Sequence, residues 1–329
     1  MINDSVFLDN RKFSWAFLAH LGYNMWADPV RDKRGVPGMP QDLTQVCAED
    51  HLRFDLDLWH KTTKELAEAG CNMLILDIGE GLQYESHPEI ACKGAWSKDV
   101  LQEEIFNLKM LGIEAIPKLN FSACHDEWMG EYGRMVSTTP YYHFCEDVIG
   151  EVCEVFGNPR LFHLGMDEET YMHQHLYNLV VIRQGEQWWH DLDFLARTTM
   201  RCGARPWIWS DYIWHHEEEF LRKMPRDILQ SNWYYGGFED QDSVYLRGFE
   251  ALEQGGFEQV PAASVWSRRD NLQRMVDYTY PRIGGERLCG YMQTVWRPMM
   301  QNYAERQKMG TETLGEAKVQ YEALTAAKE

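Results

Sequence analysis

The sequence predicts an α/β fold in which eight parallel strands, each followed by a helix, close into a (β/α)8 TIM barrel. Short apolar runs alternate along the chain with longer segments of helical hydrophobic periodicity, and there are eight of each. Several helical segments end at a glycine that leads into the next apolar run, which is typical of α/β units. No linker or low-complexity tract divides the 329 residues, so we expect a single barrel domain over residues 1–329.

The predicted strands are short apolar runs, and polar or aromatic residues follow most of them. In chain order they are Phe13–His20, Asn72–Ile78, Glu114–Leu119, Leu161–Gly165, Pro206–Ser210, Ile228–Trp233, Gln259–Val265 and Gly290–Val295. The longest irregular segments follow the first three strands and cover residues 22–42, 79–96 and 120–137. We expect them to be loops at the carboxyl end of the barrel, where barrel enzymes have their active sites.

Helical periodicity fills the intervals between these strands. The expected helices are Leu43–Ala69, Ser97–Leu111, Thr138–Phe156, Gln184–Arg201, Glu217–Lys223, Ser243–Glu253, Asn271–Tyr278 and Thr311–Ala327. A doubly wound open sheet is the competing α/β fold, and it usually carries a glycine-rich phosphate turn after its first strand. Residues 19–24 do not match G-x-G-x-x-G, which favours the barrel.

Composition argues against several classes of partner. The net charge of −19, without any basic run, repels nucleic acid and anionic lipid, and no run of 18 apolar residues could span a membrane. The eight cysteines are scattered and form no C-x-x-C pair, which predicts free thiols in a reducing compartment and no structural zinc. Met1–Ser5 does not begin a secretory signal, so a cytoplasmic location is expected. A neutral substrate fits this charge, and we expect no metal or other cofactor.

The segment 161–169 carries the clearest chemical signal, because an apolar run there ends in the three acids Asp167, Glu168 and Glu169. A buried strand that ends at carboxylates places them at the rim of the sheet, where catalytic sites lie. Adjacent carboxylates repel each other, so either Asp167 or Glu168 is expected to keep its proton near neutral pH, as glycoside cleavage requires. Neighbouring residues of a strand point to opposite faces, so both acids enter one site only if the strand ends or bulges before them.

Aromatic residues follow five of the predicted strands. A single tryptophan is typical of a protein core, but five strand ends with tryptophan together predict a pocket walled by rings, which suits the C–H face of a sugar. The rings at these ends are Trp26, Trp209, Trp214, Trp233, Tyr234, Tyr235, Trp266 and Trp296.

Polar side chains occupy the same strand ends and are candidate substrate contacts. Each of them, taken alone, could instead cap a loop or pair with an arginine. These residues are Asp77, Asn120, His125 and Asp211. The cluster at residues 215–219 is interpreted differently, because acids at a helix start favour the positive end of the helix dipole and face solvent.

The position of the carboxylates narrows the chemistry. A conventional retaining barrel glycosidase has a second Glu after its seventh strand, and residues 263–269 contain no carboxylate. An adjacent Asp-Glu pair without a distant nucleophile implies that the substrate supplies its own nucleophile.

Residues 163–168, with the sequence HLGMDE, resemble the H-x-G-G-D-E motif of family 20 glycoside hydrolases, the β-N-acetylhexosaminidases. Weaker similarities follow the chain order of that family over the whole barrel, at Pro117–Asn120 with His125, Trp207–Asp211, Trp233–Tyr235 and Thr294–Trp296. The sequence departs from the family pattern at Met166, Lys118, Asn120 and Arg297, which indicates a divergent branch.

The resemblance implies an exo-acting enzyme that hydrolyses N-acetylhexosaminides with retention by substrate-assisted catalysis. Glu168 would protonate the glycosidic oxygen, and Asp167 would orient the 2-acetamido group, whose oxygen attacks the anomeric carbon. Tyr234 or Tyr235 would bind the acetamido oxygen. His125 and His163 would hold the carboxylates, and Trp209, Trp233 and Trp296 would line the pocket. The strand-end positions add further expected substrate contacts, which are Asp77, Asn120, Asp211 and Trp266.

Two other functions are compatible with these residues. One is a barrel that binds carbohydrate without cleaving it, which the departures from the family pattern favour. The other is a metal-dependent barrel hydrolase or isomerase, although no H-x-H or H-E-x-x-H spacing supports it. Its candidate ligands are Asp77, His125, Asp126, Glu127, Asp167 and Glu168.

Overall fold

A computed structural model describes residues 13–26, 45–175, 177–240 and 242–327, and its strands form one parallel sheet in the order β6-β5-β4-β3-β2-β1-β8-β7. Every strand lies within a predicted apolar run or extends it by one residue. The strands are β1 (Ser14–His20), β2 (Met73–Asp77), β3 (Glu114–Lys118), β4 (Leu161–His163), β5 (Arg205–Trp209), β6 (Leu229–Ser231), β7 (Ala262–Ser264) and β8 (Gly290–Thr294).

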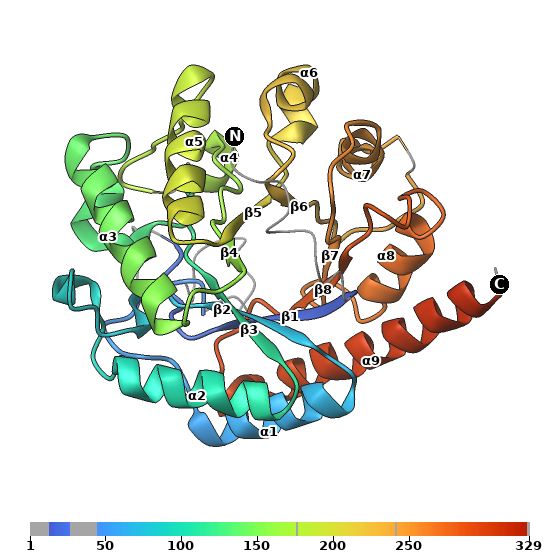
Figure 1. The fold of residues 1–329 in the computed structure, drawn as a ribbon, viewed down its shortest axis with the longest axis horizontal. Coiled ribbons are helices and arrows are strands. Elements are labelled where there is room, and N and C mark those ends of the chain that lie inside the picture. Colours follow the sequence, from blue (N-terminus) through green and yellow to red (C-terminus); the bar gives the residue numbers. More distant parts are fainter. Residues whose placement is uncertain (1–12, 27–44, 176, 241, 328–329) are drawn as a thin grey trace.

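The two ends of this sheet meet and close it into a barrel. The Gln230 amide donates to the Glu258 carbonyl at 3.1 Å, and the Val260 amide donates to the Gln230 carbonyl at 2.9 Å. A parallel bridge between Trp233 and Ala262 continues this contact between the β6 and β7 segments. The predicted (β/α)8 barrel is therefore confirmed, and helices surround the sheet (Figure 1).

The eight predicted helices are found in order, with differences at their starts, and the short helix α4 is an additional one that the sequence did not predict. They are α1 (Leu56–Glu68), α2 (Lys98–Met110), α3 (Thr139–Val155), α4 (Tyr171–Gln174), α5 (Glu186–Arg201), α6 (Ile213–Lys223), α7 (Val244–Gln254), α8 (Asn271–Thr279) and α9 (Ala304–Ala326). Helix α1 begins thirteen residues later than predicted because the Asp55 side chain caps it, accepting from the Leu58 amide at 2.8 Å. Residues 43–44 of that predicted helix lie outside the described residues, as do residues 27–42 of the first predicted loop.

Helix α9 begins seven residues earlier than predicted and runs through Gly310. A Cβ at Gly310 would lie 2.6 Å from Val295 Cγ2 and 3.0 Å from Phe17 Cε2. The glycine therefore allows close packing of α9 against β1 and the end of β8, rather than ending the helix.

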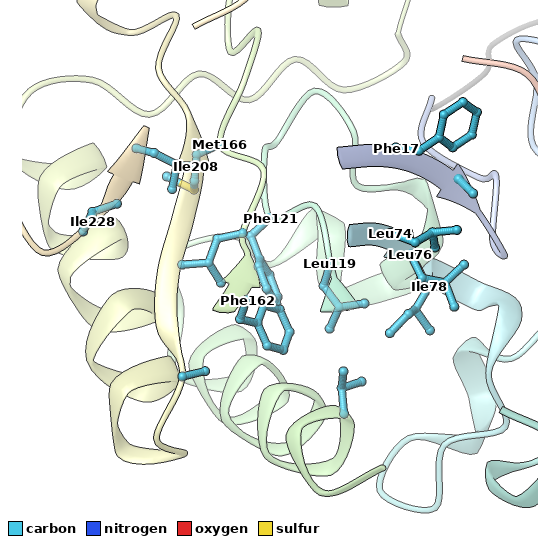
Figure 2. Close-up of a cluster of buried hydrophobic side chains, with 14 of the residues drawn as sticks. Phe17, Leu74, Leu76, Ile78, Leu119, Phe121, Phe162, Met166, Ile208 and Ile228 are labelled. Atoms are coloured by element: carbon cyan, nitrogen blue, oxygen red, sulfur yellow. The ribbon is translucent and has the colours of Figure 1, made fainter. Parts of the chain in front are cut away.

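Apolar side chains pack on both faces of the sheet. Phe17, Leu74, Leu76, Phe162 and Ile208 belong to the cluster between the strands and the helices, which Figure 2 shows in part. The alternate strand residues fill the barrel interior, in a second cluster that includes Leu18, Ile75, Ile116, Leu161 and Trp209. The same alternation carries four polar residues into the interior, one beyond each run, and these are His20, Asp77, Lys118 and His163.

Two sequence predictions about the whole chain can be compared with the structure. All eight cysteines, each of which lies among the described residues, are free thiols. No helix in the described part of the chain combines the length and apolar character needed to cross a lipid bilayer.

Candidate functional site

The backbone leaves the strand conformation before it reaches the two central acids. Strand β4 ends at His163, and Gly165, Met166 and Glu168 have positive φ angles of 72°, 75° and 60°. This irregular path brings both carboxylates to the same imidazole. Asp167 Oδ1 lies 3.3 Å from His125 Nδ1, and Glu168 Oε2 lies 3.3 Å from His125 Nε2. The condition for both acids to enter one site is thus met, because β4 has already ended.

Asn120, which follows β3, holds this turn in place. Its Oδ1 accepts from the amides of Ser122 at 3.0 Å and Met166 at 3.3 Å, and its Nδ2 donates to Asp167 Oδ1 at 2.9 Å. A Cβ at Gly165 would lie 1.9 Å from Asn120 Oδ1, so only glycine fits there. The Ser122 hydroxyl adds a hydrogen bond to the Asp167 carbonyl oxygen.

Glu168 has a second histidine partner, which the sequence did not reveal. His173 Nε2 lies 3.3 Å from Glu168 Oε1, and His173 Nδ1 lies 2.8 Å from the Thr170 hydroxyl. Thr170 also caps α4, where its Oγ1 accepts from the His173 amide at 3.4 Å. The only sequence signal was a threonine three residues before a histidine, and a four-residue helix is too short to show periodicity.

These contacts determine where protons reside. Burial opposes ionisation of Glu168, but hydrogen bonds from His125 and His173 outweigh it and lower the pKa of Glu168. Burial likewise opposes ionisation of Asp167, and the charge of His125 outweighs it and lowers the pKa of Asp167. Burial lowers the pKa of His125, but the charge of Asp167 overcomes this, and the pKa of His125 rises well above its usual value. The expectation that Asp167 or Glu168 keeps its proton is therefore wrong, because His125 favours the ionised form of both acids and His173 adds to this effect at Glu168.

Asp211, after β5, is an acid beside the pair whose pKa is raised instead. Burial, followed by the charges of Asp167 and Glu168, raises the pKa of Asp211 to about 8. Its Oδ2 accepts from the Glu168 amide at 2.9 Å, so Asp211 supports the backbone of the acid pair.

Several of the predicted aromatic rings contact one another or the histidines of the site. Trp296 Nε1 donates to Tyr235 Oη at 2.9 Å, and the Trp296 ring lies 6.0 Å from Trp209 and 5.4 Å from His20. The Trp26 ring lies 6.0 Å from that of His125. Burial raises the pKa of the Tyr235 phenol, and the charges of Glu168 and Asp167 raise it further, so Tyr235 lies within the electrostatic range of the pair.

Three predicted rings have other surroundings. Tyr234 stacks on Tyr245 at 5.7 Å and contacts Phe238, so Tyr235 rather than Tyr234 accompanies the carboxylates. The Trp233 ring lies between Tyr235 and Trp214, 5.0 Å from the first ring and 4.7 Å from the second. The Trp266 ring packs under the Arg297 guanidinium at 4.5 Å.

Asp77 and His163 lie in the barrel interior. Lys118 forms an ion pair with Asp77, and His20 Nδ1 lies 3.4 Å from Asp77 Oδ2. His163 Nδ1 accepts from the Gly165 amide at 3.1 Å, and burial together with the Lys118 charge lowers the pKa of His163 well below its usual value. His163 is therefore a neutral residue that supports the turn, while Asp77 balances the charge of Lys118.

The third acid of the cluster, Glu169, is part of a separate ion-pair network. Arg183 pairs with Glu169 through Nη2 and Nε, and its Nη1 lies 3.0 Å from Asp191 Oδ2. Glu169 Oε1 also accepts from the Ala123 amide at 2.9 Å. Sequence reasoning missed Arg183, because it is a lone arginine in an irregular segment before α5.

The candidate metal ligands do not converge as a single set. Asp77 pairs with Lys118, and Asp126 and Glu127 line a small separate pocket of about 80 Å³ beside Gly133 and Asn178. The group of donors found together in the described residues is Cys124, His125 and Glu168, whose ligand atoms all lie within 4.8 Å of one another. Residues 215–218 are exposed, as expected. The prediction that their acids open the helix is wrong, because α6 begins at Ile213 and its first turn contains no acid.

Comparison by sequence finds no relative. No protein-family model matches the chain, and no curated protein matches it either.

Comparison by structure finds family 20 enzymes. A β-N-acetylhexosaminidase from Bacteroides fragilis superimposes with a TM-score of 0.61 at 13% identity, covering 93% of this chain and 65% of that enzyme. A β-hexosaminidase mutant from Streptomyces plicatus in complex with the product GlcNAc gives 0.65 at 12%, covering 94% and 64%. A family 20 exo-β-N-acetylglucosaminidase from Vibrio harveyi in complex with N-acetylglucosamine gives 0.58 at 13%, covering 92% and 54%.

The chain thus spans less than two thirds of the length of each of these enzymes. At such identities the likeness establishes the fold. The resemblance to family 20 that the motifs predicted is therefore confirmed at the level of the barrel.

Proposed function

We propose that this protein is a glycoside hydrolase that acts on N-acetylhexosaminides by substrate-assisted, retaining catalysis. The observation that carries the proposal is the pair Asp167 and Glu168, both 3.3 Å from the one imidazole of His125, whose ring lies 6.0 Å from that of Trp26. The similarity of the fold to β-N-acetylhexosaminidases supports the same chemistry. Exo action is part of the proposal and rests on the resemblance.

In the proposed reaction, the proton comes from protonated His125, whose Nε2 lies 3.3 Å from Glu168 Oε2. Glu168 receives this proton, transfers it to the glycosidic oxygen and later removes one from water. Its side chain is 23% exposed, whereas that of Asp167 is 8% exposed, so Glu168 is the acid that a leaving group can reach. Asp167 would orient the acetamido nitrogen and stabilise the positive charge that develops when the acetamido oxygen attacks the anomeric carbon.

Tyr235 is the hydroxyl that we assign to the acetamido oxygen. Its Oη already accepts a hydrogen bond from Trp296 Nε1 at 2.9 Å, which leaves the phenol proton for an acceptor on the substrate. Trp209, Trp233 and Trp296 would provide the faces on which the sugar ring packs.

Asn120 and His173 act in this proposal as positioning residues. Asn120 directs its amide at Asp167 Oδ1, and His173 holds Glu168 Oε1, so each carboxylate keeps one oxygen committed to the protein. Glu168 Oε2 pairs with His125, and we assign proton transfer to this oxygen because it shares the imidazole with Asp167.

Hydrolysis of an aryl N-acetyl-β-hexosaminide by wild type and by Glu168→Gln tests the proposal. We expect kcat/KM to fall by a factor of about 10²–10⁴, because the amide cannot transfer the proton. Glu217→Gln, which changes an exposed acid at α6 in the same way, is the matched control and should keep wild-type activity.

An aryl glucoside without the acetamido group should be a far poorer substrate, because it lacks the internal nucleophile. Equal cleavage of both substrates would contradict substrate assistance. Binding of N-acetylglucosamine without any hydrolysis would favour the non-catalytic carbohydrate-binding barrel instead.

A further inference from the structure

We propose that Cys124, His125 and Glu168 form a binding site for a borderline divalent cation, with Zn²⁺ as its best occupant. A thiol, an imidazole and a carboxylate are the three ligand types that zinc takes in proteins. Their donor atoms all lie within 4.8 Å of one another, and ligands around a tetrahedral zinc are about 3.5 Å apart, so small side-chain rotations would close the set. The cation site does not depend on the proposed function.

The three donors come from two loops at the carboxyl end of the barrel. Cys124 and His125 are consecutive residues in the turn after β3, and Ser122 holds that turn. The Cys124 amide donates to Ser122 Oγ at 3.0 Å, and the His125 amide donates to the Ser122 carbonyl at 3.1 Å. Glu168 comes from the loop after β4. Cys124 and His125 are buried and Glu168 is partly exposed, so a cation could enter from the side of Glu168 and keep one coordination position open to solvent.

Each donor residue has an outer partner that orients it, as the ligands of zinc sites usually do. Asp167 Oδ1 lies 3.3 Å from His125 Nδ1, which leaves His125 Nε2 directed at Glu168 Oε2. His173 holds the other oxygen of Glu168, and the Tyr177 hydroxyl donates to the Cys124 carbonyl at 2.9 Å and lies 4.0 Å from its Sγ. Three ligands, each with its own partner, distinguish this group from a chance cluster of acids.

The surrounding charge also favours a cation. Ionised Asp167 lies against the cluster, and the chain carries a net charge of −19. Binding would release two protons to solvent, one from the Cys124 thiol and one from protonated His125, and leave a thiolate, a carboxylate and a neutral imidazole around a divalent ion.

The consequence for the proposed function is inhibition. Glu168 cannot transfer a proton to a leaving group while its carboxylate coordinates a cation, so bound Zn²⁺ would switch hydrolysis off and a chelator would restore it. Cys124 has no role in the proposed hydrolysis, which makes its removal a clean test.

Calorimetric titration of chelator-treated protein with Zn²⁺ provides that test. We expect one equivalent to bind to wild type, and Cys124→Ala to weaken binding at least about 100-fold, since it removes the thiolate ligand. Cys145→Ala is the matched control, because it makes the same change at another buried thiol on α3 and should bind as wild type does. Failure of wild type to bind, or unchanged binding by Cys124→Ala, would overturn the proposal.

Cobalt substitution tests whether a thiolate coordinates the cation, independently of the variants. Co²⁺ bound to wild type should show thiolate-to-metal charge-transfer absorption, and its absence would overturn the site even if Cys124→Ala failed to fold. Where hydrolysis is found, Zn²⁺ should inhibit wild type and leave Cys124→Ala active. A protein that binds Zn²⁺ with the thiolate signature but cleaves no glycoside would contradict the proposed function alone.

Discussion

At the scale of single residues, the site depends on backbone conformations that L-amino acids seldom adopt. Met166 and Glu168 have φ angles of 75° and 60°, although neither is glycine. Such residues persist only where their surroundings hold them. Here Asn120 binds the Met166 amide and Asp211 binds the Glu168 amide, so the polar residues at neighbouring strand ends stabilise the turn that presents the acids.

Gly165→Ala tests this turn. The new Cβ would meet Asn120 Oδ1 at 1.9 Å in addition to the strain of a φ of 72°, so we expect loss of the Asn120 contacts, lower stability and loss of activity. Gly157→Ala is the matched control, because its φ is 68° and no atom lies within 4 Å of the new Cβ. The control should cost about 1–2 kcal/mol from the backbone alone. Thermal unfolding that shows no larger cost at Gly165 would contradict the close contact.

Thr170→Val tests the orientation of His173. The variant removes the hydroxyl 2.8 Å from His173 Nδ1, so the imidazole should hold Glu168 Oε1 less firmly and kcat/KM should fall about tenfold. Loss of the cap should cost no more than about 1 kcal/mol in unfolding. Thr138→Val changes the residue before α3, whose side chain does not cap that helix, and should leave the activity unchanged. A wild-type rate in Thr170→Val would remove His173 from the positioning role.

At the scale of elements, an ion-pair network ties the loop after β4 to α5. Arg183 is 2% exposed and bonds Glu169 in that loop, Asp191 on α5 and the Phe121 carbonyl after β3. Burial opposes ionisation of Asp191, but the Arg183 charge and further hydrogen bonds outweigh it and lower the pKa of Asp191. This network therefore connects the loop that carries Asp167 and Glu168 to helix α5.

Arg183→Met is expected to destabilise the fold by about 3–5 kcal/mol, because it leaves buried carboxylates without their cation. The Asp191 share of this stabilisation is fully present above a pH of about 4 and is lost as the pH falls through the lowered pKa. The gap between wild type and variant should therefore narrow in acid. Denaturant unfolding of both proteins at several pH values measures this difference in the free energy of unfolding.

Arg160→Met is the control for that experiment. It breaks a pair with Glu114 whose side chains are 50% and 40% exposed, so the expected cost is only about 0–1 kcal/mol. Similar costs for Arg160→Met and Arg183→Met would show that the Arg183 network is not effectively buried.

At the scale of the whole molecule, the barrel interior is apolar at its amino-terminal end and charged toward the site. The ion pair of Lys118 with Asp77 lies at the charged end, with side-chain exposures of 0% and 5%. Because strand residues alternate between the two faces, the residues that follow Ile75 and Ile116 by two positions necessarily enter this interior. The pair is thus a consequence of barrel closure.

Lys118→Met should cost about 3–5 kcal/mol, since it leaves Asp77 buried without its ammonium partner. The double variant Lys118→Met with Asp77→Leu removes both charges and should recover most of that loss. Chemical denaturation of the two single variants and the double variant completes the cycle. Strict additivity would show that the two residues do not stabilise each other.

The sequence by itself determined the barrel, its strands to within a few residues and the arrival of the acids at the end of β4. Hydrophobic periodicity and glycine-terminated helices are local signals, which is why they could be interpreted without any tertiary contact. Asp167 and Glu168, Asn120, His125 and Asp211 could be singled out because each follows a predicted strand, and parallel strands bring such residues to one rim.

Only the tertiary structure decided how these residues meet. Asn120 and Asp167 are 47 positions apart, and no local pattern states that one amide orients the other carboxylate. Distances between loops decide that Tyr235 rather than Tyr234 accompanies the carboxylates and that His173 and Arg183 are partners of the acids. They also decide that His125 carries a proton while Asp167 and Glu168 do not. Those distances exist only once the strands have closed into a barrel, because closure places separate loops over one interior.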